Sequence, residues 1–229
     1  MSSRAEALGE SPLAIDGDAQ AELERLAHRA KRRATPEQAV VCSLSLPVAS
    51  SVDPAAAALA AEQGQADISV LELPSREQYA LASIGVALRF SASGAGRFNQ
   101  LENHWRKLCT SAVTAGDASV AGSGLVAHAQ FAFAPSNPTS QHWREFRSAE
   151  LTVPSTTIAR QGGGAVQTIN LAVEANSDVT ELVERAVSQC AALTQEPLPL
   201  LDPDPVTRPR VATVLPPEHF ESAVRQIGR

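Results

Sequence analysis

Large aromatic side chains are scarce in this 229-residue chain, since Phe, Trp and Tyr together make up only 4% of it. Apolar residues as a class reach 44%, so the chain can still bury a core, but much of that share is alanine. A core of this kind has few large side chains to anchor it. The length allows one large domain or two small ones.

Cysteine is also rare: there are three, Cys42, Cys109 and Cys190, with no C-x-x-C pair. An odd number at such wide spacing argues against a disulfide framework. Cys109 and Cys190 fall on the apolar faces of predicted helices, so we predict that they are buried free thiols. Free thiols are typical of a reducing cytosol, and we therefore expect a cytoplasmic protein.

Long apolar runs are missing too, because no stretch approaches the roughly 20 residues that a membrane-spanning helix needs. The N-terminus carries Arg4, Glu6 and Glu10 and has no apolar signal-peptide core. A net charge of −6 disfavours nucleic acid and anionic membranes as partners. The one basic run, between Arg25 and Arg33, is interpreted as the solvated C-terminal end of a helix, where cations are favourable.

Motifs that would carry catalysis or bind metal are absent from the sequence. No serine lies in G-x-S-x-G, and no two carboxylates form a persuasive acid and base pair. No H-x-x-x-H spacing occurs among the histidines, and no C-x-x-C spacing among the cysteines. The five histidines are His28, His104, His128, His142 and His219. The sequence therefore assigns no catalytic, cofactor-binding or metal-binding residue.

Other conspicuous features have structural interpretations. The glycines at 162–164 predict a hairpin turn, because no helix N-terminus follows them as a phosphate loop would require. His104 is predicted to lie on a helix surface, and His128 to be an interior histidine with satisfied hydrogen bonds. The cluster at 143–147 is interpreted as a loop held by two aromatic rings, with a binding patch as the alternative.

Hydrophobic periodicity predicts an α+β fold, an antiparallel sheet with packed helices. Helices are predicted over 18–33 with Asp18 as the N-cap, over 54–63, from about 97 with Gly116 as a stop, over 178–193, and from Pro217. The helix from 97 has one apolar stripe, and Asp178 with Glu181 resembles a capping box. Strands are predicted over 40–46, 68–73, 78–81, 83–90, 125–133, 150–153, 156–160 and 165–173.

Several segments, in order, resemble the N-terminal region of isochorismate synthases, which are chorismate-binding enzymes. Residues 82–90 (A-S-I-G-V-A-L-R-F) are similar to the family's G-x-G-x-A-x-R-F segment. Residues 97–98 (R-F) and 104–108 (H-W-R-K-L) resemble its R-F … W-R-x-L helix, and residues 124–135 resemble its strand G-G-F-x-F-D-P. In that strand Ala129 and Gln130 replace the glycine pair, and Ala134 replaces the aspartate. Residues 143–146 match W-x-x-F, strands such as 151–154 follow, and 217–229 resemble the helix W-x-x-x-V-x-x-A-x-x-x-I-x-x-G.

The resemblance divides the chain into four regions. Residues 1–38 form a variable tail and basic helix, and 39–195 an N-terminal α+β subdomain. Residues 196–210 are a linker, because five prolines between 197 and 209 remove backbone donors. Residues 211–229 begin the catalytic chorismate-binding domain.

The resemblance also implies a fold and a reaction. The fold is a large α/β sandwich of two intertwined subdomains with antiparallel sheets. In the reaction, chorismate binds with Mg²⁺, a lysine in a K-V-V-x-A-R strand activates water, and a glutamate acts as general acid. That strand and the Mg²⁺-binding glutamates are expected beyond Arg229, so we expect this chain alone to be inactive.

Three interpretations of the function of this chain stay open. The chain is the N-terminal part of an isochorismate synthase of menaquinone or siderophore biosynthesis; or it is a scaffold that a separate C-terminal polypeptide completes; or it is a stand-alone binding or regulatory module. Another chorismate-using synthase is a weaker fourth option.

Overall fold

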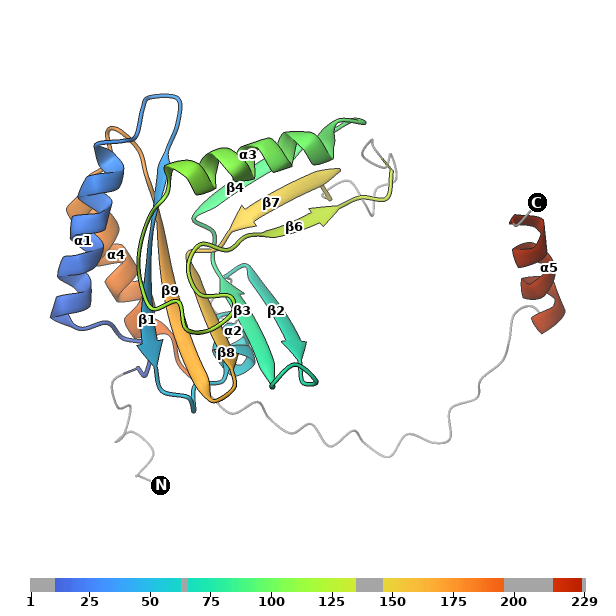
Figure 1. Ribbon diagram of the computed structural model, residues 1–229, viewed down its shortest axis with the longest axis horizontal. Helices are drawn as coiled ribbons and strands as arrows, with labels where there is room; N and C mark the ends of the chain where they lie inside the picture. Colours follow the sequence, from blue (N-terminus) through green and yellow to red (C-terminus); the bar gives the residue numbers. More distant parts are fainter. Residues whose placement is uncertain (1–10, 63–65, 135–145, 196–215, 228–229) are drawn as a thin grey trace, which may run out of the picture. The chain divides into compact units, whose positions relative to one another are not determined.

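The computed structural model of the chain describes residues 11–62, 66–134, 146–195 and 216–227 (Figure 1). They belong to two units, one within residues 1–197 and the other within residues 198–229. The second unit contains helix α5 (Pro217–Ile227), which confirms the helix predicted from Pro217. The predicted linker at 196–210 lies outside the described residues. In its described part, the first unit contains two sheets and four helices.

The larger sheet has six strands in the order β2-β3-β8-β9-β1-β5. Their bounds are β1 (Val40–Val48), β2 (Ile68–Leu73), β3 (Tyr79–Ile84), β5 (Val113–Gly116), β8 (Thr156–Gln161) and β9 (Gly164–Val173). Every neighbouring pair is antiparallel except β1 with β5. The long pairing of β1 with β9 aligns Val40 with Val173, so segments far apart in the sequence hold the sheet together.

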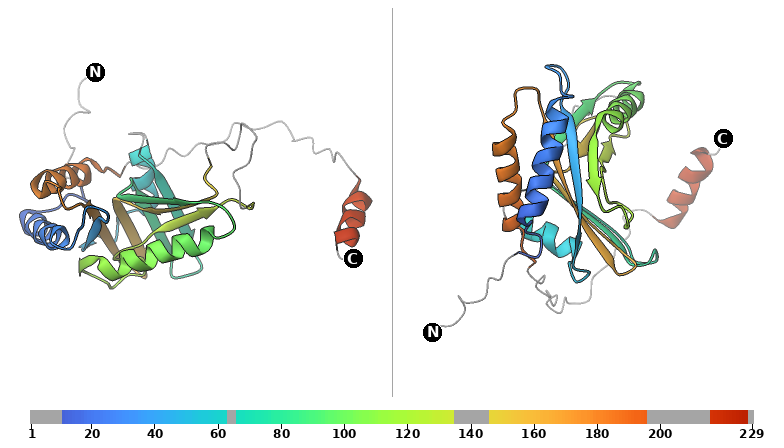
Figure 2. Two further views of the ribbon diagram at one scale, coloured as in Figure 1. Left: turned by 90° about the horizontal axis from the view of Figure 1, so that it is seen from above. Right: turned by 60° about the vertical axis from the view of Figure 1, so that its left-hand side comes forward.

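Three helices cover one face of this sheet: α1 (Gly17–Lys31), α2 (Pro54–Glu62) and α4 (Val179–Ala192) (Figure 2). Leu23 and Leu26 of α1 and Val183 of α4 are buried together against Cys42 of β1. Each such side chain contributes about 1.5–3 kcal/mol when fully buried. Over β2 and β3, the alanines of α2 fill the core instead, so helix and sheet approach closely there.

Helix α1 begins and ends at polar contacts. Its N-cap is Asp16, whose Oδ1 accepts a hydrogen bond from the Ala19 N–H at 2.8 Å. The prediction of Asp18 as N-cap was wrong, because Asp18 lies in the first turn of the helix. Its carboxylate there interacts favourably with the positive end of the helix dipole. At the other end, the Arg33 guanidinium donates to the Ser111 carbonyl oxygen at 3.5 Å.

The second face of the larger sheet carries small polar side chains that pair with one another. Ser43 Oγ donates to Asn170 Oδ1 at 2.7 Å, and the hydroxyls of Ser45 and Thr168 lie 2.8 Å apart. The Gly124 N–H donates to Ser45 Oγ at 2.9 Å, so the segment leading into β6 lies over this face. These groups are buried, and their mutual hydrogen bonds remove the cost of leaving them unpaired.

The smaller sheet has three strands in the order β4-β7-β6, and helix α3 (Arg97–Ser111) packs on it (Figure 1). Its strands are β4 (Leu88–Ala92), β6 (His128–Phe131) and β7 (Ala149–Val153). Two short connections lead from one sheet directly into the other, at Gly85 between β3 and β4 and at Ser155 between β7 and β8. Since β3 pairs with β8 and β4 with β7, the same ribbon of two strands continues from one sheet into the other.

Several predicted boundaries were wrong at this bend and at the end of α3. The predicted strands 78–81 and 83–90 are one strand, β3, followed by a break at Gly85, whose φ is +67°, and then β4. α3 does not continue to Gly116, because the backbone of Ala112 is already extended (φ −55°, ψ 150°) and the next residues form β5. The strand predicted over 125–133 is ordered as β6 only from His128 to Phe131.

The three cysteines are free, but only two of them are buried. Burial raises the pKa of the Cys42 thiol to about 12 and that of Cys190 to about 11. The prediction of a buried Cys109 was wrong: it is exposed. It lies beside the buried stripe formed by Leu101 and Leu108 and not within it. No helix in the described residues is long and apolar enough to span a membrane.

Candidate functional site on the smaller sheet

The segments that carry the family resemblance come together in one place. Residues 82–90 run from β3 into β4, residues 97–108 form most of α3, residues 124–134 include β6, and residues 151–154 include the end of β7. In sequence they are separate, but in the structure they build the smaller sheet and its helix. This substructure is therefore the candidate site.

The register of the three strands gives the smaller sheet one apolar and one polar face. Phe90 pairs with Leu151, and both pack toward Leu101 and Trp105 of α3. On the opposite face Arg89 and His128 both lie beside Thr152, while Gln130 lies beside Glu150. Because successive side chains of a strand point to opposite faces, the apolar side chains face α3 and the polar ones lie on the other face of the sheet.

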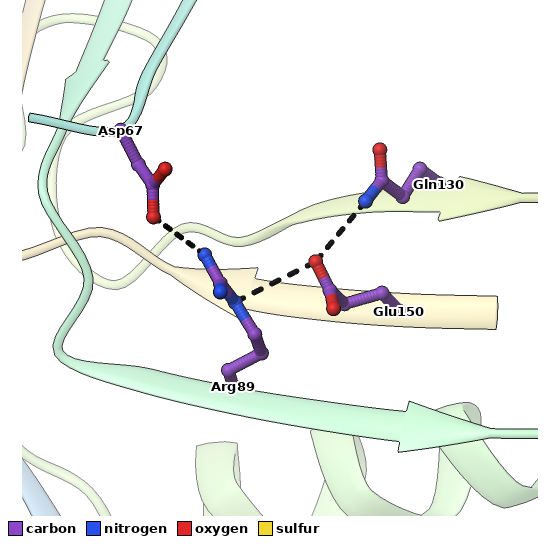
Figure 3. A network of polar contacts seen from close by, with 4 residues as sticks. All are labelled: Asp67, Arg89, Gln130 and Glu150. Carbon is purple, nitrogen blue, oxygen red and sulfur yellow. Dashed lines mark hydrogen bonds and ion pairs between the residues drawn. The ribbon is translucent and has the colours of Figure 1, made fainter. Parts of the chain in front are cut away.

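A polar network crosses this second face (Figure 3). The Arg89 guanidinium lies 2.6 Å from Asp67 Oδ2 through Nη2 and 3.5 Å from Glu150 Oε1 through Nε. Gln130 Nε2 donates to the same Glu150 oxygen at 3.0 Å. Asp67 is well exposed, but the Glu150 side chain is only 11% exposed. The Glu150 pair therefore contributes more to order than the Asp67 pair, which water screens.

Gln130 stands where the resembling family has a glycine. A glycine would leave Glu150 without its amide donor, so the departure from the family pattern adds one hydrogen bond to this network. A carboxylate held by a guanidinium and an amide acts as a fixed acceptor that aligns β4, β7 and β6. The arrangement suits positioning of the strands rather than proton transfer, because Glu150 Oε1 is already engaged by Arg89 and Gln130 of the neighbouring strands.

His128 is half-buried at the end of this network, and its Nδ1 has no hydrogen-bond partner in the described residues. The prediction of a histidine with satisfied hydrogen bonds was wrong. Burial lowers its pKa, and the nearby Arg89 cation lowers it further, while Glu150 and Asp67 act in the opposite direction. The neutral ring is therefore the form that the fold favours.

We expect His128 to make stability depend on pH. Its folded pKa lies below the unfolded value of 6.5, so the unfolded chain binds the proton first as the pH falls. The contribution of His128 is complete above pH 6.5 and is lost as the pH falls through the folded pKa. Urea unfolding between pH 7 and pH 5 should therefore show a shallower pH slope for His128→Gln than for the wild type. Solvent screening limits the difference to about a few tenths of a kcal/mol, and equal slopes would contradict the expectation.

Arg97 has a role that sequence reasoning did not find. Its guanidinium is buried and donates to the carbonyl oxygens of Gly94 at 3.3 Å and Ala132 at 3.1 Å. It also lies 4.4 Å from the Phe98 ring centroid, and that ring packs on Phe131 with centroids 4.7 Å apart. The R-F pair of the resembling motif thus ties the start of α3 to the end of β6. The sequence feature that could have indicated this role is an arginine directly before the apolar stripe of a predicted helix.

The remaining predicted residues do not enlarge the site. His104 lies on the α3 surface, as predicted, and Gly162 and Gly163 have φ of +57° and +86° in the β8–β9 turn, which confirms the hairpin. His142 and the start of the aromatic cluster, residues 143–145, lie outside the described residues. In the part of the chain that the structure describes, no group of three His, Cys, Asp or Glu could hold a metal ion. These residues therefore do not fit the Mg²⁺ that the resemblance implies.

A family model described as chorismate binding enzyme matches residues 25–229. The chain belongs to the chorismate-binding enzyme family. It is 33% identical over 78 residues to the salicylate biosynthesis isochorismate synthase of Pseudomonas aeruginosa, an alignment that covers 34% of this chain and 15% of that protein. Among solved structures it is similar to the menaquinone-specific isochorismate synthase from Escherichia coli, with a TM-score of 0.45 and 18% identity over 77% of this chain.

This chorismate-binding family member spans well under two thirds of each relative. Its matches cover 15% of the P. aeruginosa protein and 35% of the E. coli enzyme. The resemblance of segments predicted from the sequence is thus confirmed at the level of the family. The observed α+β architecture also agrees with the predicted fold class.

Proposed function

We propose that this chain is the N-terminal part of an isochorismate synthase, an isomerase that converts chorismate to isochorismate. The family match over residues 25–229 carries the proposal, and the identity with a protein named as an isochorismate synthase supports the choice of reaction. The product would supply menaquinone or siderophore biosynthesis. A cytoplasmic location fits the three free cysteines.

In this proposal the chain supplies scaffold rather than catalytic groups. Its share of the work is to hold α3, β4, β6 and β7 in register through Arg97 and the Glu150 network. The activating lysine, the general acid and the Mg²⁺ ligands would belong to a catalytic region beyond the described residues. We therefore expect no turnover by the 229-residue chain alone.

The test uses the purified chain with chorismate and Mg²⁺, alone and mixed with a catalytic region made from the P. aeruginosa relative. Isochorismate is measured by chromatography, with the catalytic region alone as the control. Turnover that rises only in the mixture supports the proposal. Isochorismate from the chain alone would overturn the assignment of a scaffold. An aminated product in the presence of ammonia would assign the chain to another chorismate-using synthase.

A further inference from the structure

A hollow of about 300 Å³ lies between α3, the edge strand β4 and the turn that precedes β1. It is outside the polar network, because β4 directs Leu88 and Phe90 into it and Arg89 to the opposite face. Leu108 of α3 completes the apolar wall. A volume of this size is at the small end of ligand sites and suits a molecule of about ten non-hydrogen atoms.

One wall of the hollow is aromatic, because His104 and Phe90 both line it. The rings of His104 and Phe90 stack with centroids 4.8 Å apart and an angle of 19° between their planes. Phe90 packs against the buried cluster that contains Leu108 and Val153, which restricts its orientation. The face of His104 that Phe90 does not cover favours a planar ring, which stacks on it in offset geometry.

The other walls supply charge and rigidity. Lys107, one turn after His104, lines the hollow and has no ion-pair partner among the described residues. Its neighbour Arg106 is already paired with Glu102 at 2.6 Å. The facing turn is closed by two backbone hydrogen bonds between Thr35 and Gln38, of 3.0 and 3.2 Å.

A single anionic group is the best complement to this charge. Lys107 offers an ammonium to a carboxylate, and charge-assisted hydrogen bonds are the strong ones. Glu37 also lines the hollow, and its carboxylate would repel a second negative charge on a ligand. The hollow therefore selects for one carboxylate on a planar ring rather than for a dianion.

We propose that this hollow, which we call the His104–Lys107 pocket, binds a small aromatic monocarboxylate. The ring stacks on the face of His104 that Phe90 leaves free, and the carboxylate accepts a hydrogen bond from Lys107 Nζ. No covalent step is involved, and the proposal is independent of isochorismate synthesis, because the binding test needs neither chorismate nor Mg²⁺.

Calorimetric titration of the purified chain with benzoate and salicylate tests the pocket. We expect saturable binding with one site per chain. Lys107→Gln should weaken benzoate binding about tenfold, the loss expected for one charge-assisted hydrogen bond. His104→Ala should weaken it by a smaller factor, about fivefold, through the lost stacking. Both positions are exposed on α3, so neither change should unfold the chain.

Matched controls separate the pocket from general attraction of anions. Arg76→Gln removes one exposed cation in the β2–β3 turn and should leave benzoate affinity unchanged. Benzamide, which keeps the ring but lacks the charge, should bind weakly and equally to the wild type and to Lys107→Gln. The proposal is overturned if benzoate does not saturate the wild type, or if Arg76→Gln and Lys107→Gln weaken binding to the same extent.

Discussion

Replacing Gly116 by alanine should destabilise the chain by about 4 kcal/mol or more, the range of exceptional single substitutions. Gly116 ends β5 with a φ of +102°, and a Cβ there would lie 1.9 Å from the Ser45 carbonyl oxygen. That oxygen cannot move away, because it accepts a hydrogen bond of 2.9 Å from the Asp117 N–H. The methyl group would therefore separate β5 from β1.

The measurement is urea unfolding followed by circular dichroism, with Gly94→Ala as the matched control. Gly94 also has a positive φ, +77°, but an added Cβ there meets no atom within 4 Å. The control isolates the backbone strain, which costs about 1 kcal/mol. If both variants lose the same stability, then contact with Ser45 is not the cause.

Replacing Asn170 by leucine should cost about 3 kcal/mol, although the two side chains have similar size. Asn170 is buried, its Oδ1 accepts from Ser43 Oγ at 2.7 Å and its Nδ2 donates to the Pro154 carbonyl oxygen at 3.0 Å. Leucine would leave both partners buried and unpaired, at about 1–3 kcal/mol each. The Pro154 contact lies at the bend between the sheets, so the substitution should loosen the smaller sheet first.

Hydrogen exchange with urea unfolding tests both parts of this expectation. Exchange should accelerate in β4 and β7 more than in β1 and β9. Asn103→Leu on the exposed surface of α3 is the control, and its stability should change by about 0.5 kcal/mol or less. Uniform acceleration throughout the chain would show that Asn170 stabilises the fold without a special role at the bend.

Much of the local structure could be predicted, because its causes are local. The apolar spacing of α4 and its cap at Asp178, which accepts from the Glu181 N–H at 3.2 Å, can be read from neighbouring residues. The same holds for the β8–β9 hairpin, where Gly162 and Gly163 permit positive φ. These elements agree with the predicted ones to within one or two residues.

What could not be predicted depends on contacts between distant residues. Nothing near Gly85 distinguishes a bend between two sheets from an ordinary turn, since the bend exists only because β3 and β4 find different partners. Residues 113–116 were predicted as the end of the helix from 97, because the sequence shows no stop signal before Gly116. They form strand β5 because they pair with β1. Cys109 was misplaced because periodicity gives the apolar direction of a helix but not the width of the surface that covers it.

The candidate site also combines features with local causes and features that depend on contacts between distant residues. The segments that carry the family resemblance form the strands and helix of the smaller sheet, but the sequence assigned no site residue among them. The roles of its residues depend on register, which brings Arg89, Gln130 and Glu150 together from three strands. No spacing in the sequence connects these positions.

The pairing of β1 has a consequence for how the protein is made. Both neighbours of β1 follow it in the sequence: β5 ends at Gly116 and β9 at Val173. At 5–20 residues per second, the ribosome needs on the order of ten seconds to deliver β9 after β1 has emerged. Until β5 emerges, the apolar run of Val40, Val41, Cys42 and Leu44 has no strand beside it, and one edge of β1 stays open until β9 follows. The nascent chain therefore presents a binding site for a chaperone well before any substrate could meet the finished fold.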